Sequence, residues 1–320
     1  MQHAPATVAL TGATGFIGRH LAVRLAAEGW RVRALARRPA EELRRPGVEI
    51  VPGSLEDTGS LRTLLQGADA IVHAAGLTSA GRAADFHRVN AAATARLASL
   101  CSEPGAPRRF LLLSSLAARH PDLSDYALSK RRAEQALAES PLDWTALRPP
   151  AVYGPGDPAT LQIFRLLKRG ILPVPPDPAA RLSMIYVEDL CGAVAALLAA
   201  PGGAGPDAVW GAVWEVRDAC AEGYGWRDIA AAAGRYFGRD VRCIPVPKPL
   251  LWLGGHMSVL KYQLTRDPPR FSPGKVRELC HIDWVCRGNP LADLTRWRPG
   301  VGIEEGFRRT LDWYREKRWL

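Results

Sequence analysis

The stretch Thr11-Gly12-Ala13-Thr14-Gly15-Phe16-Ile17-Gly18 decides the fold class of this chain. An apolar strand, Val8-Ala9-Leu10, leads into it, and a helical pattern leads out. Gly12 permits a tight turn, Gly15 lets the backbone approach a pyrophosphate, and Gly18 lets the helix pack closely on the strand. The free N–H groups at the helix start then face the phosphates. Because the three glycines lie between a strand and a helix, they predict a dinucleotide-binding loop rather than a turn without a ligand.

Short apolar strands alternate with helical patterns through residues 1–150. The expected strands are 8–10, 31–36, 48–51, 70–73, 110–113 and 144–147, and the expected helices are 16–28, 57–66, 83–102 and 125–139. This alternation predicts an α/β fold of the Rossmann type, a doubly wound parallel sheet that binds its ligands at the carboxyl ends of its strands.

The pattern changes after Arg148, where proline-rich loops begin. We therefore predict an NAD(P)-binding Rossmann domain over 1–150 and a smaller, interleaved substrate-binding lobe mainly over 151–320. Helices are expected at 159–169 and 188–200. Residues 183–200 are predicted to return to the first domain.

Composition limits the class of protein. The 320 residues are 47% hydrophobic, which suffices for a large core, and no N-terminal leader pattern is visible, so a cytoplasmic location is expected. The longest apolar run, 190–200, is about half of a membrane span. The six cysteines form no C-x-x-C pair, and no metal site is predicted. The net charge of +10 suits an acidic cofactor or an anionic lipid, but no nucleic-acid module accompanies it.

The segment Tyr126-Ala127-Leu128-Ser129-Lys130 carries the predicted chemistry. It places a tyrosine and a lysine one helical turn apart on the same face. The ammonium favours the phenolate and lowers the tyrosine pKa, so Tyr126 is a candidate for proton transfer while a hydride moves at the adjacent carbon. Taken alone, the pair is more often a surface tyrosine and lysine. Its position after a nucleotide loop and after Ser114-Ser115 at a strand end favours catalysis.

This order of motifs resembles the extended short-chain dehydrogenase/reductases, also called the NAD-dependent epimerase/dehydratase family. The resemblance extends over almost the whole chain. The further segments that carry it are Val72–Gly76, Val89-Asn90, Leu147–Pro155, Ser183–Leu190, Trp297–Pro299, Ile303–Gly306 and Thr310–Tyr314. It implies an NAD(P)-dependent enzyme.

The resemblance also implies roles for individual residues. Tyr126 would be the general acid/base, Lys130 would bind the nicotinamide ribose, and Asn90 would support Lys130 through water. Ser115 or Ser114 would hydrogen-bond the reacting oxygen, with Ser115 favoured. The predicted cofactor-binding residues are Gly12, Thr14, Gly15, Phe16, Ile17, Gly18, Arg37, Arg38, Ser54, Leu55, Ala74, Ala75, Gly76, Lys130, Pro149 and Val152.

The end of the second strand bears on the choice of cofactor. An acidic residue there would bind the ribose 2′-OH of NAD, but this chain has Ala36-Arg37-Arg38-Pro39. Two guanidinium groups suit a 2′-phosphate, so NADP(H) is preferred, and NAD(H) is the alternative if the arginines are only solvated. Ser54 replaces the aspartate that meets adenine in the family, and Glu56 or Asp57 could substitute for it.

The stretch Pro245–Gly255, followed by Val259–Tyr262, looks like the 3β-hydroxysteroid dehydrogenase-like branch, whose members act on sterols and related lipids. Its apolar residues could line a pocket or touch a membrane, with Lys248 and Lys261 beside anionic headgroups. Ordinary packing of a helix is the favoured interpretation. The apolar residues concerned are Trp252, Leu253, Val259 and Leu260.

The sequence thus predicts an NADP(H)-dependent oxidoreductase that interconverts a secondary alcohol and a ketone on a sterol-like or other apolar small molecule. A nucleotide-sugar epimerase or dehydratase with bound NAD is one alternative, disfavoured because Leu116 stands where sugar-active members carry a hydroxyl. A non-catalytic, cofactor-binding structural or regulatory protein is another, disfavoured by the intact Tyr126 and Lys130. A homodimer is the family's usual state and is expected here by default.

Overall fold

The computed structural model describes residues 6–201, 208–266, 269, 271–288 and 290–320. The chain forms two compact units. The first comprises Met1–Arg148, Cys191–Trp214 and Pro290–Trp297, and the second comprises Pro149–Leu190, Glu215–Asn289 and Arg298–Leu320. The chain re-enters the first unit at Cys191, whereas the sequence placed that return at 183.

A seven-stranded sheet forms the centre of the first unit, in the order β11-β6-β5-β4-β1-β2-β3. The strands are β1 (Thr7–Thr11), β2 (Arg31–Ala36), β3 (Val48–Pro52), β4 (Ala70–His73), β5 (Arg109–Leu113), β6 (Asp143–Arg148) and β11 (Ala212–Glu215). Strands β1 to β6 pair in parallel throughout. This confirms the predicted doubly wound fold and its six strands.

Strand β11 was not predicted from the sequence. It lies at the β6 edge, where the Gly211 N–H donates to the Trp144 carbonyl over 2.5 Å and the Thr145 hydroxyl donates to the Ala212 carbonyl over 3.2 Å. A strand that returns from a distant part of the chain has no local partner in sequence, so strand–helix alternation does not reveal it.

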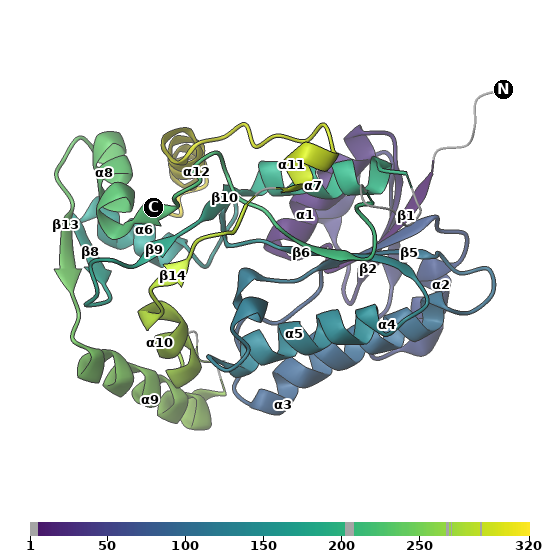
Figure 1. Cartoon of the computed structure of the whole chain (residues 1–320), viewed down its shortest axis with the longest axis horizontal. Coiled ribbons are helices and arrows are strands. Elements are labelled where there is room, and N and C mark those ends of the chain that lie inside the picture. Colours follow the sequence, from purple (N-terminus) through teal and green to yellow (C-terminus); the bar gives the residue numbers. More distant parts are fainter. Residues whose placement is uncertain (1–5, 202–207, 267–268, 270, 289) are drawn as a thin grey trace. The chain divides into compact units, whose positions relative to one another are not determined.

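Helices cover both faces of this sheet: α4 and α5 lie on one face and α1 on the opposite face (Figure 1). The helices of this unit are α1 (Phe16–Ala27), α2 (Thr58–Leu65), α3 (Ala83–Phe86), α4 (Ala93–Cys101), α5 (Asp125–Ala138), most of α7 (Val187–Ala199) and α11 (Pro290–Leu294). Leu61, Leu97 and Leu137 pack with Phe110 of the sheet in one buried cluster. The helix predicted over 83–102 is interrupted by a π-helical turn, His87–Ala92.

Three small sheets form among the described residues of the second unit. Strand β7 (Ala151–Tyr153) pairs in parallel with β10 (Met184–Tyr186), and β8 (Ile171–Val174) with β13 (Arg242–Pro245). Strand β9 (Arg181–Leu182) lies between β12 (Tyr224–Gly225) and β14 (Asp283–Trp284). Strand β10 belongs to the segment 183–200 that was predicted to return to the first domain, and its partner is β7 and not a strand of the seven-stranded sheet.

Helices surround an aromatic core in the second unit. Phe164, Phe307 and Tyr314 are buried and meet edge to face. The helices are α6 (Leu161–Lys168), α8 (Trp226–Phe237), α9 (Lys248–Thr265), α10 (Pro273–Cys280) and α12 (Ile303–Glu316). In the described part of the chain, no helix combines the length and the apolar character needed to cross a membrane.

Candidate active site

The glycine loop between β1 and α1 is crowded at two of its glycines. Gly12 has φ +74°, and a Cβ there would lie 2.5 Å from the Ala75 nitrogen. A Cβ at Gly18 would lie 2.0 Å from the Gly12 carbonyl oxygen. Larger residues would force the strand, the loop and the helix apart. At Gly15 the nearest atom to an added Cβ is 3.2 Å away, and Gly15 itself is exposed.

The start of α1 fits an anion. Its N-cap residue is Gly15, which has no side chain to satisfy the first N–H groups, and its first turn contains no acidic residue. These N–H groups lack partners within the helix and carry the positive end of its dipole. Thr14 and Gly15 are exposed in front of them. The loop therefore fits the pyrophosphate of a dinucleotide.

Two exposed arginines follow β2. Within the described residues, neither Arg37 nor Arg38 takes part in a hydrogen bond or an ion pair. The Gly53 N–H donates to the Ala36 carbonyl over 3.0 Å, which brings the end of β3 beside them. Both guanidinium groups are therefore available to a ligand at the carboxyl end of β2.

The residues near Ser54 have partners of their own. The Ser54 hydroxyl accepts from the Glu56 N–H over 3.3 Å. Asp57 caps α2 by accepting from the Gly59 and Ser60 N–H groups, and Glu56 pairs with Arg88. Of these three side chains, Ser54 is the one not committed to a helix cap or an ion pair.

Leu55 follows Ser54 in the segment between β3 and α2. It is half-buried against the core of the first unit, and its carbonyl accepts from Arg96 over 2.7 Å.

The segment after β4 connects the glycine loop to Lys130. The Ala74 N–H donates to the Thr11 carbonyl over 3.2 Å. A Cβ added at exposed Gly76 would lie 3.0 Å from both the Asn90 Oδ1 and the Lys130 Nζ. Ala74, Ala75 and Gly76 therefore form a strip of small residues between the glycine loop and the candidate catalytic side chains.

Lys130 is 6% exposed, although it carries an ammonium group. Its Nζ donates to the Leu113 carbonyl at the end of β5 over 3.0 Å. Burial lowers the pKa of Lys130 to about 8, and the Glu134 carboxylate partly opposes this shift. A cation held in this way lowers the pKa of a neighbouring acid, and its remaining N–H protons can be donated to the hydroxyl groups of a ligand.

Asn90 organises the surroundings of Lys130 from the π-helical turn. Its Oδ1 accepts from the Leu77 N–H over 2.8 Å, and its Nδ2 donates to the Leu77 carbonyl over 3.0 Å. The same Nδ2 donates to the Ser129 Oγ over 2.9 Å, and Ser129 donates to the Tyr126 carbonyl over 2.7 Å. Asn90 thus fixes the turn of α5 that carries both Tyr126 and Lys130.

Sequence reasoning missed Ser129. A serine in the middle of a helix commonly donates its hydroxyl to a carbonyl three or four residues earlier, and this tendency could have identified Ser129 as a contact to Tyr126.

Tyr126 lies in the first turn of α5, one turn before Lys130. Ser124 caps this helix by accepting from the Ala127 N–H over 3.0 Å. The Tyr126 ring is half-buried, and its centroid is 6.0 Å from that of Phe86. The Ser124 cap thus fixes the start of the helix that carries Tyr126, and the Phe86 ring lies beside the Tyr126 ring.

Ser115 and Ser114 differ sharply in their surroundings. Ser115 is half-buried, and its Oγ accepts from the Ala117 N–H over 3.2 Å, which leaves its proton for another partner. Ser114 is 4% exposed and donates to Glu134 Oε1 over 2.5 Å. Glu134 in turn accepts hydrogen bonds from the Arg148 Nε over 2.9 Å and from the Arg148 Nη2 over 2.6 Å. Ser114 is therefore hydrogen-bonded to the carboxylate of a buried ion pair that Glu134 forms with Arg148.

His73 is a second residue that sequence reasoning missed. It ends the apolar strand β4, and its Nδ1 shares a hydrogen bond of 2.6 Å with the Thr11 hydroxyl. Complete burial, with the charge of Lys130 as a second cause, lowers the pKa of His73 to about 3. The His73 imidazole is therefore neutral, and it is bonded to the residue that directly precedes Gly12 of the glycine loop. A histidine closing a strand of otherwise apolar residues was the signal.

Pro149 and Val152 belong to the second unit. Pro149 is buried, and Val152 of β7 lies opposite Ile185 of β10. The first unit thus brings together Gly76, Asn90 and Lys130, whereas these two predicted residues lie in a different body of the chain.

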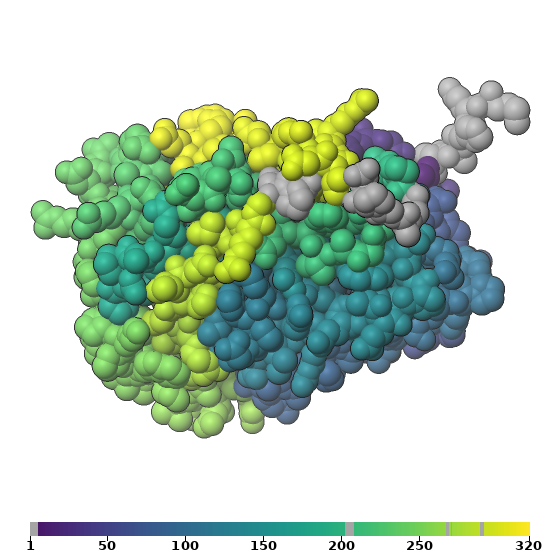
Figure 2. All heavy atoms as spheres, in the orientation of Figure 1, coloured from purple at the N-terminus to yellow at the C-terminus, as the bar shows by residue number. Residues whose placement is uncertain are grey.

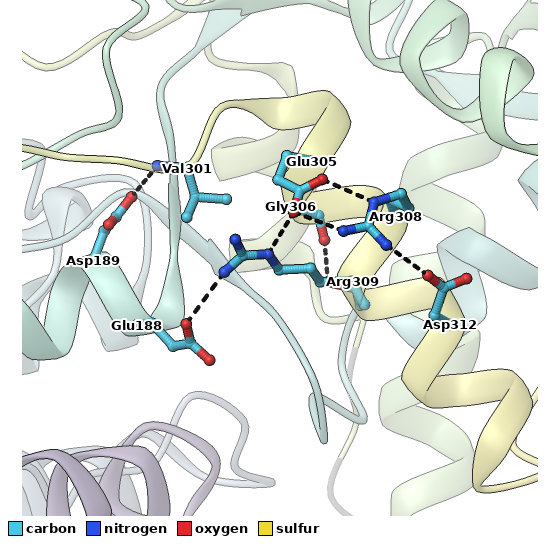
Figure 3. Close-up of polar contacts among 9 residues, drawn as sticks. Glu188, Asp189, Val301, Glu305, Gly306, Arg308, Arg309 and Asp312 are labelled. Atoms are coloured by element: carbon cyan, nitrogen blue, oxygen red, sulfur yellow. Dashed lines mark hydrogen bonds and ion pairs between the residues drawn. The ribbon is translucent and has the colours of Figure 1, made fainter. Parts of the chain in front are cut away.

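The segment Ser183–Leu190 has a structural part in the second unit. The Asp189 carboxylate accepts from the Gly300 N–H over 3.1 Å. It also accepts from the Val301 N–H over 2.9 Å (Figure 3). Glu188 forms an exposed ion pair with Arg309 over 3.5 Å. These contacts join the start of α7 to α12 and to the segment that leads into it.

Residues 8–210 match the model of the NAD dependent epimerase/dehydratase family. Among curated proteins, the ceramide reductase of Caulobacter vibrioides (strain NA1000 / CB15N) is 40% identical over 316 residues, which cover 98% of this chain and 96% of that protein. The uncharacterized protein YbjS of Escherichia coli (strain K12) is 26% identical and covers 97% of this chain and 98% of its own length.

Solved structures share the fold at lower identity. The UDP-glucose 4-epimerase of Thermus thermophilus in complex with NAD matches with a TM-score of 0.72 at 22% identity, over 97% of this chain and 99% of that chain. The UDP-glucuronic acid 4-epimerase of Bacillus cereus in complex with NAD matches with a TM-score of 0.70 at 18% identity, over the same shares.

Proposed function

Since this chain belongs to the NAD-dependent epimerase/dehydratase family, we propose that it is an NADP(H)-dependent reductase that converts a ketone in a ceramide-class lipid to a secondary alcohol. Family membership and its reductase relatives make it an NAD(P)-dependent oxidoreductase-type enzyme. The observation that carries the proposal is the buried Lys130 ammonium, one helical turn from Tyr126 and held by the Leu113 carbonyl beside Asn90.

In the proposed reaction, Tyr126 gives its phenolic proton to the carbonyl oxygen as that oxygen gains negative charge. Lys130 stabilises the resulting phenolate, because its buried ammonium carries a positive charge in a poorly solvated place. Ser115 donates a hydrogen bond from its hydroxyl group to the same oxygen, keeps its proton, and orients the substrate. Asn90 and Ser129 act as positioning residues, through the turn that holds Tyr126 and Lys130.

The nicotinamide cofactor, when bound, supplies the hydride that the carbonyl carbon takes up. The glycine loop and the start of α1 would hold its pyrophosphate, and Gly76 leaves room beside Lys130 for its ribose. Arg37 and Arg38 would bind a 2′-phosphate at the end of β2. Support for NADP(H) is that both arginines are exposed and that no acidic residue stands in their place.

The ceramide class is proposed because the 40% identical relative covers nearly the whole chain. Reduction of a ketone on the long-chain base of such a lipid gives the secondary hydroxyl that ceramides carry. A sterol-like ketone is the second candidate, since the stretch Pro245–Gly255 resembles the 3β-hydroxysteroid dehydrogenase-like branch. A nucleotide-sugar epimerase is the third, supported by solved epimerase structures that share the fold.

The first test is titration of the purified protein with NADPH and with NADH, followed by quenching of tryptophan fluorescence. We expect tighter binding of NADPH and no nucleotide retained through purification. The double variant Arg37→Ser/Arg38→Ser should weaken NADPH binding by roughly 10- to 100-fold while NADH binding stays unchanged, because two charge-assisted contacts to phosphate are lost.

The matched control is Arg45→Ser, another exposed arginine of the first unit, which should bind both nucleotides like the wild type. Tightly retained NAD with equal affinity for both nucleotides would overturn the NADP(H) assignment and favour the epimerase. NADPH binding without turnover on ceramide-class, sterol and short-chain ketones would favour a non-catalytic, cofactor-binding protein.

A further inference from the structure

Helix α9 carries a row of exposed apolar side chains. Leu250, Leu253, Met257, Leu260 and Leu264 recur every three or four residues and are 51–81% exposed. At 3.6 residues per turn this spacing places all five on one side of the helix, along about 21 Å of its length. A row of exposed apolar side chains as long as this on a folded protein marks a surface that contacts another molecule or a membrane. We call these five residues the α9 stripe.

The opposite side of α9 is anchored to its own unit. Leu251 is 8% exposed, and buried Gly255 lies against Val276 of α10. Phe271, just before α10, lies against Gly254. The helix is therefore fixed by its inner side, and α9 and α10 lie next to each other in the second unit (Figure 1). The α9 stripe points outward as a consequence, and the green atoms of this region form part of the surface in Figure 2.

The charged residues of the segment 241–266 have one sign. Residues 241–266 contain four basic side chains, Arg242, Lys248, Lys261 and Arg266, and no aspartate or glutamate. All four are exposed. Among the described residues, neither Lys248 nor Lys261 pairs with a carboxylate. A helix with an apolar row and an unpaired cation at its start and another near its end suits the boundary between anionic headgroups and acyl chains.

We propose that α9 docks on the surface of an anionic lipid bilayer, with the α9 stripe inserted among the acyl chains and Lys248 and Lys261 among the headgroups. The occupant is a membrane and not a second copy of this chain. If two copies paired through α9, the lysines of both helices would lie at the same interface. No acidic residue of α9 could neutralise them, so the helices would repel each other. The idea deepens the proposed function, because an enzyme acting on a membrane lipid must reach its substrate in the bilayer.

The test is flotation of the full chain with vesicles of phosphatidylcholine alone and of phosphatidylcholine with phosphatidylglycerol, without substrate or cofactor. We expect binding to the anionic vesicles and little to the neutral ones. Lys248→Gln/Lys261→Gln should lower the partition coefficient about 25-fold, at about fivefold per charge. Leu253→Glu/Leu260→Glu should lower it at least tenfold or so, because two apolar groups are replaced by carboxylates.

Matched controls are Val23→Glu on α1 and Ile163→Glu on α6, each an exposed apolar residue outside the stripe, which should float like the wild type. Binding that is equal on neutral and anionic vesicles, or unaffected by Leu253→Glu/Leu260→Glu, would overturn the proposal. The proposal would also be overturned if the wild type failed to bind vesicles and formed a dimer that Leu253→Glu/Leu260→Glu dissociates.

Reduction of a short-chain, water-soluble ketone separates this proposal from the proposed function. We expect the α9 variants to keep that activity, because α9 contributes no residue to the candidate active site. Vesicle binding without any ketone reduction would leave the docking surface standing and remove the proposed function, whereas reduction without vesicle binding would do the reverse.

Discussion

Ser114 and Ser115 stand side by side at the end of β5, yet their hydroxyl groups have different partners. The first is buried and donates to Glu134, whereas the second accepts from a helix N–H and keeps its proton. The difference follows from the extended backbone just beyond β5, in which successive side chains point to opposite sides. Adjacent identical residues therefore separate into a structural hydroxyl and a candidate catalytic one.

This difference predicts opposite effects of two alanine substitutions. Ser114→Ala should lower the free energy of unfolding by about 2 kcal/mol, because a hydrogen bond to a buried carboxylate is lost, and should leave kcat within a few-fold. Ser115→Ala should lower kcat by about 100-fold with little change in stability. Urea denaturation and steady-state kinetics on both variants check this. A loss of kcat in Ser114→Ala with full activity in Ser115→Ala would exchange the two roles.

At the scale of elements, the site depends on how α5 is held against the sheet. Asn90 reaches α5 because the π-helical turn His87–Ala92 interrupts the longer helix. Such turns insert an extra residue and commonly occur at functional sites. The Arg148–Glu134 ion pair holds the other side of α5 to the end of β6.

The contact between α7 and the approach to α12 is the element-scale feature of the second unit. Asp189→Ala should lower the free energy of unfolding by about 2 kcal/mol, because two backbone N–H groups lose a charged acceptor. Glu188→Ala, which removes only an exposed ion pair with Arg309, should cost less than about 1 kcal/mol. Amide hydrogen exchange at Val301 should accelerate in the first variant alone. Equal effects of both substitutions would mean that Asp189 does not hold this segment.

At the scale of the whole molecule, buried His73 links stability to pH. Its native pKa of about 3 lies below the ordinary value of 6.5, so between these values the unfolded chain binds a proton that the native chain does not. This part of the stability is complete above pH 6.5 and is lost as the pH falls toward 3.

Relative to a His73→Gln variant, the wild type should lose about 2 kcal/mol of unfolding free energy between pH 6.5 and pH 5. Urea denaturation of both proteins at each pH measures this difference. Parallel stability curves over this range would show that His73 takes up its proton normally in the native protein.

Sequence patterns predicted the parts of this molecule that depend on neighbours in the chain. The glycine loop, the six parallel strands and the helix carrying Tyr126 and Lys130 are all local patterns, and the strands and the fold class are confirmed. What sequence could not supply depends on distant partners. β11 needs the β6 edge, and Ser114 was distinguished from Ser115 only by Glu134 and Arg148. The roles assigned to Tyr126, Lys130 and Ser115 stay predictions.

The most direct test of the central claim, that this chain reduces a ketone with Tyr126 as the proton donor, is deuterium transfer. Wild type and Tyr126→Phe would each be incubated with a ceramide-class ketone and NADPH deuterated at the nicotinamide C4, and the product would be analysed by mass spectrometry. We expect a secondary alcohol carrying one deuterium from the wild type and at least about 100-fold less from the variant, which loses general acid catalysis. An alcohol formed equally fast by Tyr126→Phe, or a wild type that leaves the ketone unreduced, would contradict the account.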